Sequence, residues 1–201
     1  MLNLMQHLLI IVAMCVAGFT RPASINTADK PKVIIETDLG DITVEVDLKN
    51  APITAANFMR YVDEGRFEIA SFYRVVRMDN QPQNDVKIEV IQGGIGFGES
   101  DLRLDPIKHE TTAETGILHK DGVISMARLE PGSAASEIFI CIGDQPELDF
   151  EGRRNPDGQG FAAFGYVVEG MDVVRKIQAQ ADTDQMLDEP VKIISVKRAG
   201  G

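Results

Sequence analysis

Tryptophan is absent from this chain of 201 residues, and cysteine occurs only twice, as Cys15 and Cys141. Histidine is also scarce, because His7, His109 and His119 are the only ones, and they lie far apart in the sequence. Their positions have neither the spacing of a metal site nor that of a nucleophile and its base. The sequence therefore predicts no bound metal, no other cofactor and no hydrolytic chemistry.

Basic clusters are lacking too. Acidic side chains outnumber basic ones by 31 to 20, which gives a formal net charge of −11, and no run of Lys and Arg interrupts this excess. Such a chain repels phosphate backbones and anionic lipid surfaces. Nucleic acid and, for the mature protein, membrane are therefore excluded as partners.

Only one long apolar run occurs, and it lies near the N-terminus. Leu8–Phe19 has the length of the apolar part of a signal peptide and is too short to span a bilayer. We expect residues 1–24 to be a secretory signal, cleaved at a site that the sequence does not define. The protein would then be exported to the periplasm or another extracytoplasmic compartment of a bacterium. Because no Lys or Arg precedes the run, an uncleaved anchor remains open as an alternative.

Cleavage would remove Cys15 and leave Cys141 alone, so the mature protein could form no internal disulfide. Cys141 lies in the apolar run Ile138–Ile142, which predicts a buried, unreactive thiol. Packing must therefore supply the stability of the fold.

A single domain is expected over residues 33–198, after a short polar linker at 25–32. Residues 33–37 and 41–47 alternate apolar and polar side chains on either side of Gly40, which predicts an antiparallel hairpin. Further strand-like runs follow, separated by segments rich in Gly, Pro, Asp and Asn: 71–76, 87–92, 123–127, 137–142, 162–167 and 191–198.

Two helices are expected. In residues 51–65, Pro52 and Thr54 mark a start, apolar residues recur at helical spacing, and Gly65 marks the end. Residues 171–179 form the second helix. About eight strands with one early and one late helix predict a mainly β fold, an eight-stranded antiparallel closed barrel capped by two helices.

Two irregular stretches, 79–86 and 144–159, are too long to be hairpin links, and we expect them to border the functional face. No heptad repeat or exposed apolar stripe requires a partner subunit, so a monomer is expected. The glycine-rich run 93–98 does not predict a nucleotide site. Glu99 stands at the last Gly position of G-x-G-x-x-G, no Lys follows, and an acid there would repel pyrophosphate.

Two strands each carry a long polar side chain among apolar residues, in Phe72-Tyr73-Arg74-Val75 and Ile91-Gln92-Gly93-Gly94. With Met126-Ala127, the run 137–140 and Phe161–Gly165 in the same order, these motifs resemble the cyclophilin family of peptidyl-prolyl cis-trans isomerases. The resemblance runs from about Val33 to Arg198. It implies the barrel with two capping helices that the strand count predicts independently. It also implies faster rotation about X–Pro bonds of polypeptides, which has a barrier of ~20 kcal/mol and needs neither a base nor a cofactor.

The resemblance assigns roles to individual residues. Arg74 matches the family's catalytic arginine, which can hydrogen-bond the prolyl nitrogen as that nitrogen loses amide conjugation. Gln92 matches the glutamine that bonds the substrate backbone, and Phe139 matches the floor of the proline pocket. Further substrate-binding positions are those of Ala127, Leu148, Phe161, Val90, Glu137 and Glu89.

Several positions depart from the family pattern. Glu89 and Val90 replace Phe and Met, Glu137 replaces Gln, and Phe161 replaces His. The two acids could pair with Arg74, hold it in place, compete with substrate for its donors, or face solvent if the alignment shifts at the preceding loop. The family's variable tryptophan falls near Glu147, which implies weak cyclosporin binding.

Two functions follow from these residues. The leading hypothesis is a peptidyl-prolyl isomerase that assists the folding of proline-containing proteins in the cell envelope. The alternative is a cyclophilin-like module that binds Pro-containing segments as a chaperone or assembly factor, with little catalysis, and the altered pocket positions favour it. Because Arg74, Gln92 and Phe139 are all present, we expect measurable activity of reduced efficiency.

Overall fold

The computed structural model describes residues 30–200 of the chain. Its strands are β1 (Lys32–Thr37), β2 (Gly40–Val46), β3 (Ser71–Val76), β4 (Val90–Gly94), β5 (Val123–Met126), β6 (Ile138–Cys141), β7 (Ala162–Glu169), β8 (Asp182–Thr183) and β9 (Met186–Arg198). Its helices are α1 (Pro52–Asp63), α2 (Thr112–Thr115), the 3-10 turn η1 (Pro146–Leu148) and α3 (Met171–Gln178). The expected signal peptide and most of the expected linker lie outside the described residues.

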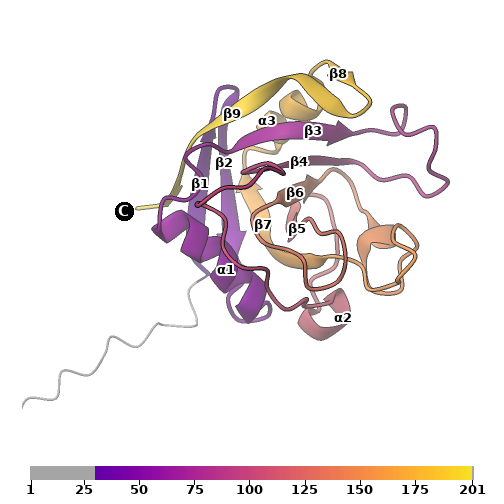
Figure 1. The fold of residues 1–201 in the computed structure, drawn as a ribbon, viewed down its shortest axis with the longest axis horizontal. Coiled ribbons are helices and arrows are strands. Elements are labelled where there is room, and N and C mark those ends of the chain that lie inside the picture. Colours follow the sequence, from indigo (N-terminus) through magenta and orange to yellow (C-terminus); the bar gives the residue numbers. More distant parts are fainter. Residues whose placement is uncertain (1–29, 201) are drawn as a thin grey trace, which may run out of the picture.

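The strands form one antiparallel sheet that closes on itself, because β1 pairs with β9 as well as with β2 (Figure 1). The order around the barrel is β1-β2-β7-β5-β6-β4-β3-β9, and β8 pairs only with β9. The eight-stranded antiparallel barrel predicted from the sequence is therefore confirmed, with the two-residue β8 as an addition.

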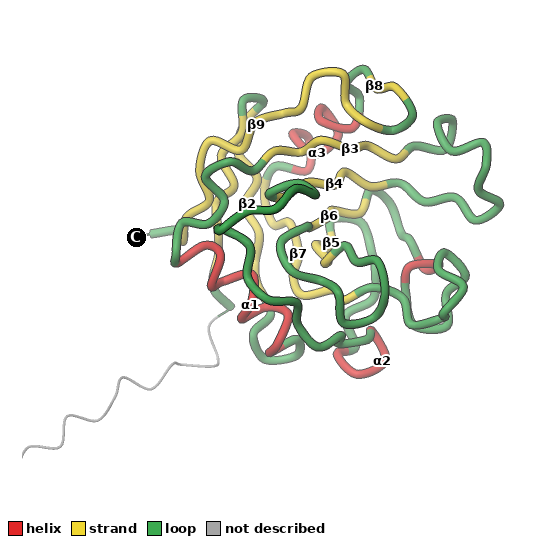
Figure 2. Tube along the Cα trace, in the orientation of Figure 1, coloured by secondary structure: helices red, strands yellow, loops and turns green. Residues whose placement is uncertain are grey.

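Both expected helices are present, and α2 and η1 are additional short turns (Figure 2). Helix α1 packs against β7 and β9, while α3 packs against β2, β3 and β4. Among residues 30–200, no helix is long and apolar enough to cross a membrane.

The first hairpin turns tightly through Asp38 and Leu39, so that Thr37 pairs with Gly40. Gly40 has φ of +130°, a conformation that favours glycine. A Cβ atom there would also lie 2.9 Å from Cγ2 of Val173 on α3. Conformation and close packing together require glycine at the position where the sequence predicted the turn.

Helix α1 begins at Pro52, as predicted, but its free N–H groups are satisfied from a distant part of the chain. The Glu110 carboxylate accepts from the N–H of Ile53 and Thr54, at 3.2 and 2.7 Å, and from the Thr54 hydroxyl at 2.6 Å. A negative charge at a helix N-terminus is favourable. Gly65, with φ of +64°, follows the end of the helix.

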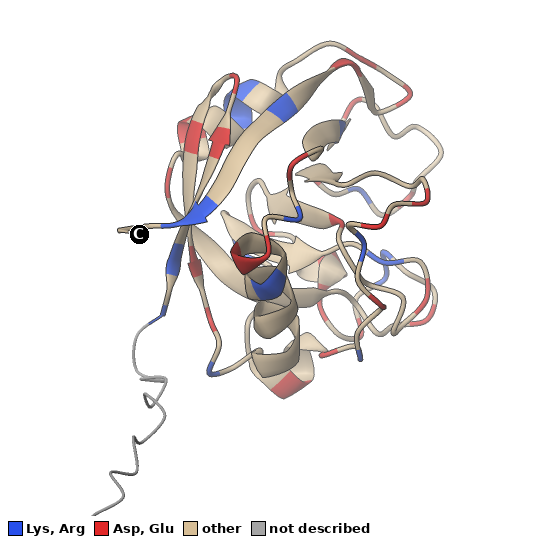
Figure 3. Ribbon diagram, turned by 60° about the vertical axis from the view of Figure 1, so that its left-hand side comes forward, with Lys and Arg blue, Asp and Glu red and all other residues tan. Residues whose placement is uncertain are grey.

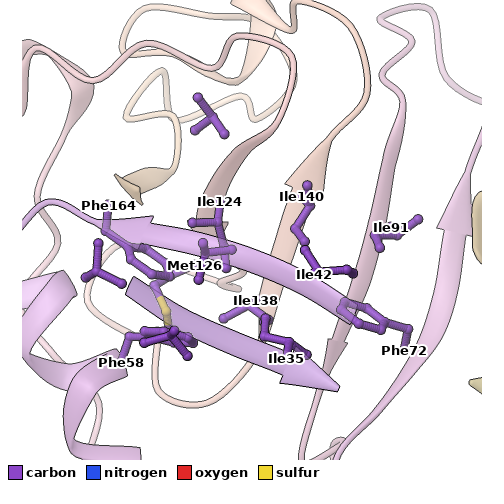
Figure 4. Packing of buried hydrophobic residues seen from close by; sticks show 14 of the residues in the cluster. Ile35, Ile42, Phe58, Phe72, Ile91, Ile124, Met126, Ile138, Ile140 and Phe164 are labelled. Atoms are coloured by element: carbon purple, nitrogen blue, oxygen red, sulfur yellow. The ribbon is translucent and has the colours of Figure 1, made fainter. Parts of the chain in front are cut away.

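Apolar side chains from every strand around the barrel and from α1 form one core cluster. Figure 4 shows part of this cluster. Alternate residues of the first hairpin are completely buried, which agrees with the pattern read from the sequence: Val33, Ile35, Ile42, Val44 and Val46. Cys141 is also completely buried and free, and burial raises the pKa of its thiol. The predicted unreactive thiol is therefore supported.

Two strands begin three or more residues away from their predicted start. Residues 87–89 are not strand, because the Gln81 side chain bonds the backbone of Ile88, while β4 continues through Gly93 and Gly94. Strand β9 begins at Met186 rather than at residue 191, and a register shift opposite β3 accommodates the segment that contains Pro190. Proline can stay in such a segment because the ladder is interrupted there.

Candidate active site

A cavity of about 370 Å³ opens at the side of the barrel where β3, β4 and β6 meet the two long loops, which project together in Figure 1. All of the site residues predicted from the sequence line it except Glu89. Those present are Arg74, Val90, Gln92, Ala127, Glu137, Phe139, Leu148 and Phe161. Of the two irregular stretches, 144–159 lines the cavity through Leu148, Arg154 and Asn155. Stretch 79–86 contributes no lining residue, although Ile88, just after it, does line the cavity.

Arg74 is half-buried on β3 and is held by neutral acceptors. Its Nη1 donates to Oε1 of Gln92 at 2.7 Å, and its Nε and Nη2 donate to Oε1 of Gln185 at 3.2 and 2.6 Å. Burial lowers the pKa of the guanidinium, which stays charged at neutral pH. Within residues 30–200 no carboxylate forms an ion pair with Arg74, so neither acid predicted near it plays that part.

A chain of hydrogen bonds connects Arg74 to Glu137. The amide Nε2 of Gln92 donates to the Tyr73 hydroxyl at 3.1 Å, and that hydroxyl donates to Oε2 of Glu137 at 2.6 Å. Oε1 of Glu137 accepts from the Ser136 hydroxyl at 2.9 Å and from the N–H of Gly96 at 3.1 Å. Glu137 thus fixes Gln92 through Tyr73, and Gln92 in turn fixes Arg74.

Burial changes the pKa of both titratable groups at the Glu137 end of this chain. It raises the pKa of Glu137, although the hydrogen bonds from Tyr73 and Ser136 partly oppose that change. Burial and the adjacent Glu137 carboxylate also raise the pKa of Tyr73 far above its usual value, so its hydroxyl keeps its proton. The carboxylate further requires a glycine at position 94, since a Cβ there would lie 2.6 Å from Oε2 of Glu137.

The other end of the cavity is apolar. Phe139 lies in a small cluster of buried side chains, Val76, Ile88, Val90, Cys141 and Leu148, with Ala127 and Phe161 packed against it. The rings of Phe139 and Phe161 meet edge to face, with centroids 5.3 Å apart. Val90 and Phe161, which depart from the family pattern, therefore keep this end of the cavity apolar.

A Ser–His–Asp arrangement lies next to Phe139. Nε2 of His119 bonds Oγ of Ser125 at 3.0 Å, and Nδ1 bonds Oδ1 of Asp149 at 2.8 Å. The imidazole also stacks on Phe139 with centroids 5.8 Å apart. The spacing in the sequence did not reveal this arrangement, but His119 and Ser125 are completely buried and do not line the cavity. Its geometry therefore serves packing and not hydrolysis.

Glu89 does not line the cavity, in contrast to the assignment made from the sequence. Ile88 and Val90 on either side of it do, and alternate residues of an extended chain point to opposite faces. The Glu89 backbone oxygen instead accepts from the N–H of Ile142 at 2.9 Å. Glu147, near the family's tryptophan position, is likewise outside the cavity lining and pairs with Arg153 at 2.8 Å.

Sequence reasoning assigned no role to several side chains at the cavity, among them Tyr73 and Gln185 in the hydrogen-bond network of Arg74, and Arg154 in the cavity lining. Tyr73 stands beside Arg74 in the motif, but the alternation along β3 gave it no predicted role. Gln185 and Arg154 lie in a turn and a loop, where no periodic signal exists. Only the loop length pointed to the surroundings of Arg154.

The cyclophilin-type peptidyl-prolyl cis-trans isomerase/CLD family model matches residues 32–198. The chain belongs to this cyclophilin family. Its enzyme class is accordingly that of an isomerase of X–Pro bonds, as the motifs predicted.

Individual cyclophilins agree with this membership. A peptidyl-prolyl cis-trans isomerase of Acinetobacter baylyi is 37% identical over 176 residues, which cover 82% of this chain and 84% of that protein. Peptidyl-prolyl cis-trans isomerase B of Escherichia coli is 35% identical over 153 residues, or 74% of this chain and 85% of that protein. The fold is similar to that of a cyclophilin-type isomerase of Cryptosporidium parvum, crystallised in the presence of the dipeptide Ala-Pro. The TM-score is 0.67 at 19% identity, over 85% of this chain and 99% of that one.

Proposed function

We propose that this cyclophilin isomerises X–Pro bonds with Arg74 as the donor to the prolyl nitrogen, Gln92 as the group that orients the peptide, and Phe139 as the floor under the proline ring. The observation that carries the proposal is the position of Arg74. Its guanidinium is anchored by two amide oxygens and lines the same cavity as the apolar cluster around Phe139.

The donors of Arg74 suit this role. Of the five N–H groups of a guanidinium, three bond Gln92 and Gln185, which leaves one N–H on each terminal nitrogen for substrate. In the planar ground state the prolyl nitrogen is a poor acceptor, and it becomes a better one as rotation breaks conjugation. A donor fixed beside it therefore stabilises the twisted state more than either planar isomer.

Gln92 has one free donor as well. Its carbonyl oxygen accepts from Arg74, and its amide nitrogen donates to Tyr73, so one N–H remains to bond a substrate carbonyl. At the other end, the apolar cluster provides a dry surface for a proline ring. Neither role requires a cofactor.

The test is isomerisation of a proline tetrapeptide, measured by exchange NMR for wild type, Arg74→Ala and Arg60→Ala. Arg60 is an exposed arginine on α1. We expect Arg74→Ala to lower kcat/KM about 100-fold, the usual effect of losing one transition-state donor. Arg60→Ala should match wild type. If folded wild type does not accelerate exchange, the binding-module alternative takes the lead; if Arg74→Ala stays fully active, the assigned role is wrong.

We also propose that the protein works as a monomer on exported polypeptides in the bacterial envelope and assists their folding. The apolar run in residues 1–24, which lies outside the described part of the chain, supports the export step. Cell fractionation with N-terminal sequencing of the mature protein tests it. A protein that keeps residue 1 in the cytosol would contradict export, and light scattering measures the mass in solution.

A further inference from the structure

The charge of the cavity is opposite to that of the protein. Acidic residues exceed basic ones by 31 to 20 in the whole chain, and Figure 3 shows both kinds interspersed along it. The charged side chains that line the cavity are instead Arg74, Arg103, Arg128, Arg154 and a single acid, Glu137. The lining of the cavity therefore carries an excess of positive charge, although the protein as a whole is acidic.

One of these arginines is paired with a carboxylate, and a second is bonded to backbone oxygens. Arg128 forms a two-pronged pair with Asp157, with both N–O distances at 2.8 Å. Arg103 donates to the backbone oxygens of Gly96 and Gly98, and its charge acts on Glu137, whose pKa it partly lowers. Like Arg103, Arg74 and Arg154 have no carboxylate partner within residues 30–200.

Arg154 is held firmly although it has no carboxylate partner among the described residues. It comes from the long loop after η1, and its Nη1 donates to Oε1 of Gln81 at 3.1 Å and to the oxygen of Val86 at 2.6 Å. Gln81 is completely buried, and its amide also bonds the backbone oxygens of Arg77 and Ile88. The loop between β3 and β4 therefore fixes the arginine of the other loop at the cavity.

Only Nη1 of Arg154 is engaged. Its Nε and Nη2 have no acceptor among the residues that the structure describes, and the side chain is half-buried. Burial lowers the pKa of the Arg154 guanidinium, and the positive charge of Arg74 lowers it further. Two like charges that are half-buried in the lining of one cavity are costly, and an incoming carboxylate would relieve that cost.

From this geometry we infer, building on the proposed isomerase function, that Arg154 is a subsite for a substrate carboxylate. The enzyme then prefers X–Pro segments with Asp or Glu directly beside the proline. A cavity of about 370 Å³ holds only a short peptide segment, so the carboxylate and the proline must be near neighbours. The acidic residues on the protein surface repel an acidic peptide only weakly, because charges farther away than ~8 Å are screened at physiological salt.

The preference is measured with tetrapeptides that carry Glu or its neutral isostere Gln, placed directly before the proline in one set and directly after it in another. Exchange NMR gives kcat/KM without a coupling protease. In wild type we expect a Glu-to-Gln ratio of at least 5 in one set, which shrinks towards 1 as salt rises from 20 to 500 mM.

Arg154→Gln is expected to abolish this ratio, and Arg154→Lys to retain part of it because the charge remains. The matched control is Arg153→Gln, since Arg153 is the adjacent arginine, is exposed, pairs with Glu147 and does not line the cavity. It should leave the ratio unchanged. Turnover of the Gln peptides by each variant shows that the fold and the isomerase site persist.

The outcomes separate the two proposals. Equal rates for Glu and Gln peptides in both sets, or a Glu preference that survives Arg154→Gln, overturn the carboxylate subsite while isomerase activity stands. If wild type accelerates neither kind of peptide, the proposed isomerase function fails as well.

Discussion

At the scale of single residues, the buried acid Glu137 is the clearest departure from an ordinary pocket. It is nearly inaccessible, and three hydrogen-bond donors surround its carboxylate. Burial nevertheless dominates and raises its pKa. The folded protein therefore binds a proton at this position more tightly than the unfolded chain does. In the unfolded chain the pKa of a Glu is about 4.3.

Stability should consequently fall as the pH rises from about 4.3 through the folded pKa of Glu137, because the folded state holds more protons in that window. Glu137→Gln removes this contribution. We expect the stability of wild type relative to the variant to decrease as the pH rises from about 4.3. Urea unfolding at a series of pH values measures it. Parallel curves for the two proteins would mean that Glu137 titrates normally.

At the scale of elements, the turn between β8 and β9 holds the side chain of Arg74 through Gln185. Gln185 occupies it with φ of +73° and is buried. Its Nε2 donates to the oxygen of Asn80 at 3.0 Å, its own N–H donates to Asp182 at 3.0 Å, and its Oε1 receives Arg74. The hairpin therefore positions the arginine proposed as the catalytic donor.

Gln185→Ala should release Arg74 from this anchor while Gln92 still holds the other side. We expect kcat/KM for an Ala-Pro peptide to fall about 10-fold, mainly through kcat, because a misplaced donor weakens only the twisted state. Asp184→Ala is the control, since Asp184 shares the turn and a positive φ of 52° but is exposed. Equal activity of the two variants would mean that Gln185 does not contribute to catalysis.

At the scale of the whole molecule, closure of the barrel joins the two ends of the domain. Ile35 of β1 is completely buried and stands opposite both Ile42 of β2 and Val196 of β9. Because the last barrel strand closes on the first, the described domain has no separable half. We expect it to unfold in a single transition.

Ile35→Ala should lower the free energy of unfolding by about 2–4 kcal/mol and keep the transition single. The adjacent Ile34 points to the other face and is half-buried, so Ile34→Ala should cost clearly less. Far-UV circular dichroism and tyrosine fluorescence, followed together in urea, measure both effects. Two separate transitions, or equal losses for the two variants, would contradict this account.

The local sequence determined what depends on period and order. Alternation in the first hairpin, helical spacing in α1 and the motifs around Arg74, Gln92 and Phe139 predicted the barrel and the family. Each motif is contained within a few neighbouring residues, and the order of the motifs can be read along the chain. Only the tertiary structure decided how the site is held. Gln185 reaches Arg74 across 111 positions, Glu110 caps α1 across 56, and Gln81 fixes Arg154 across 73. Partners so distant are chosen by strand register and loop packing, which leave no periodic signal in the chain.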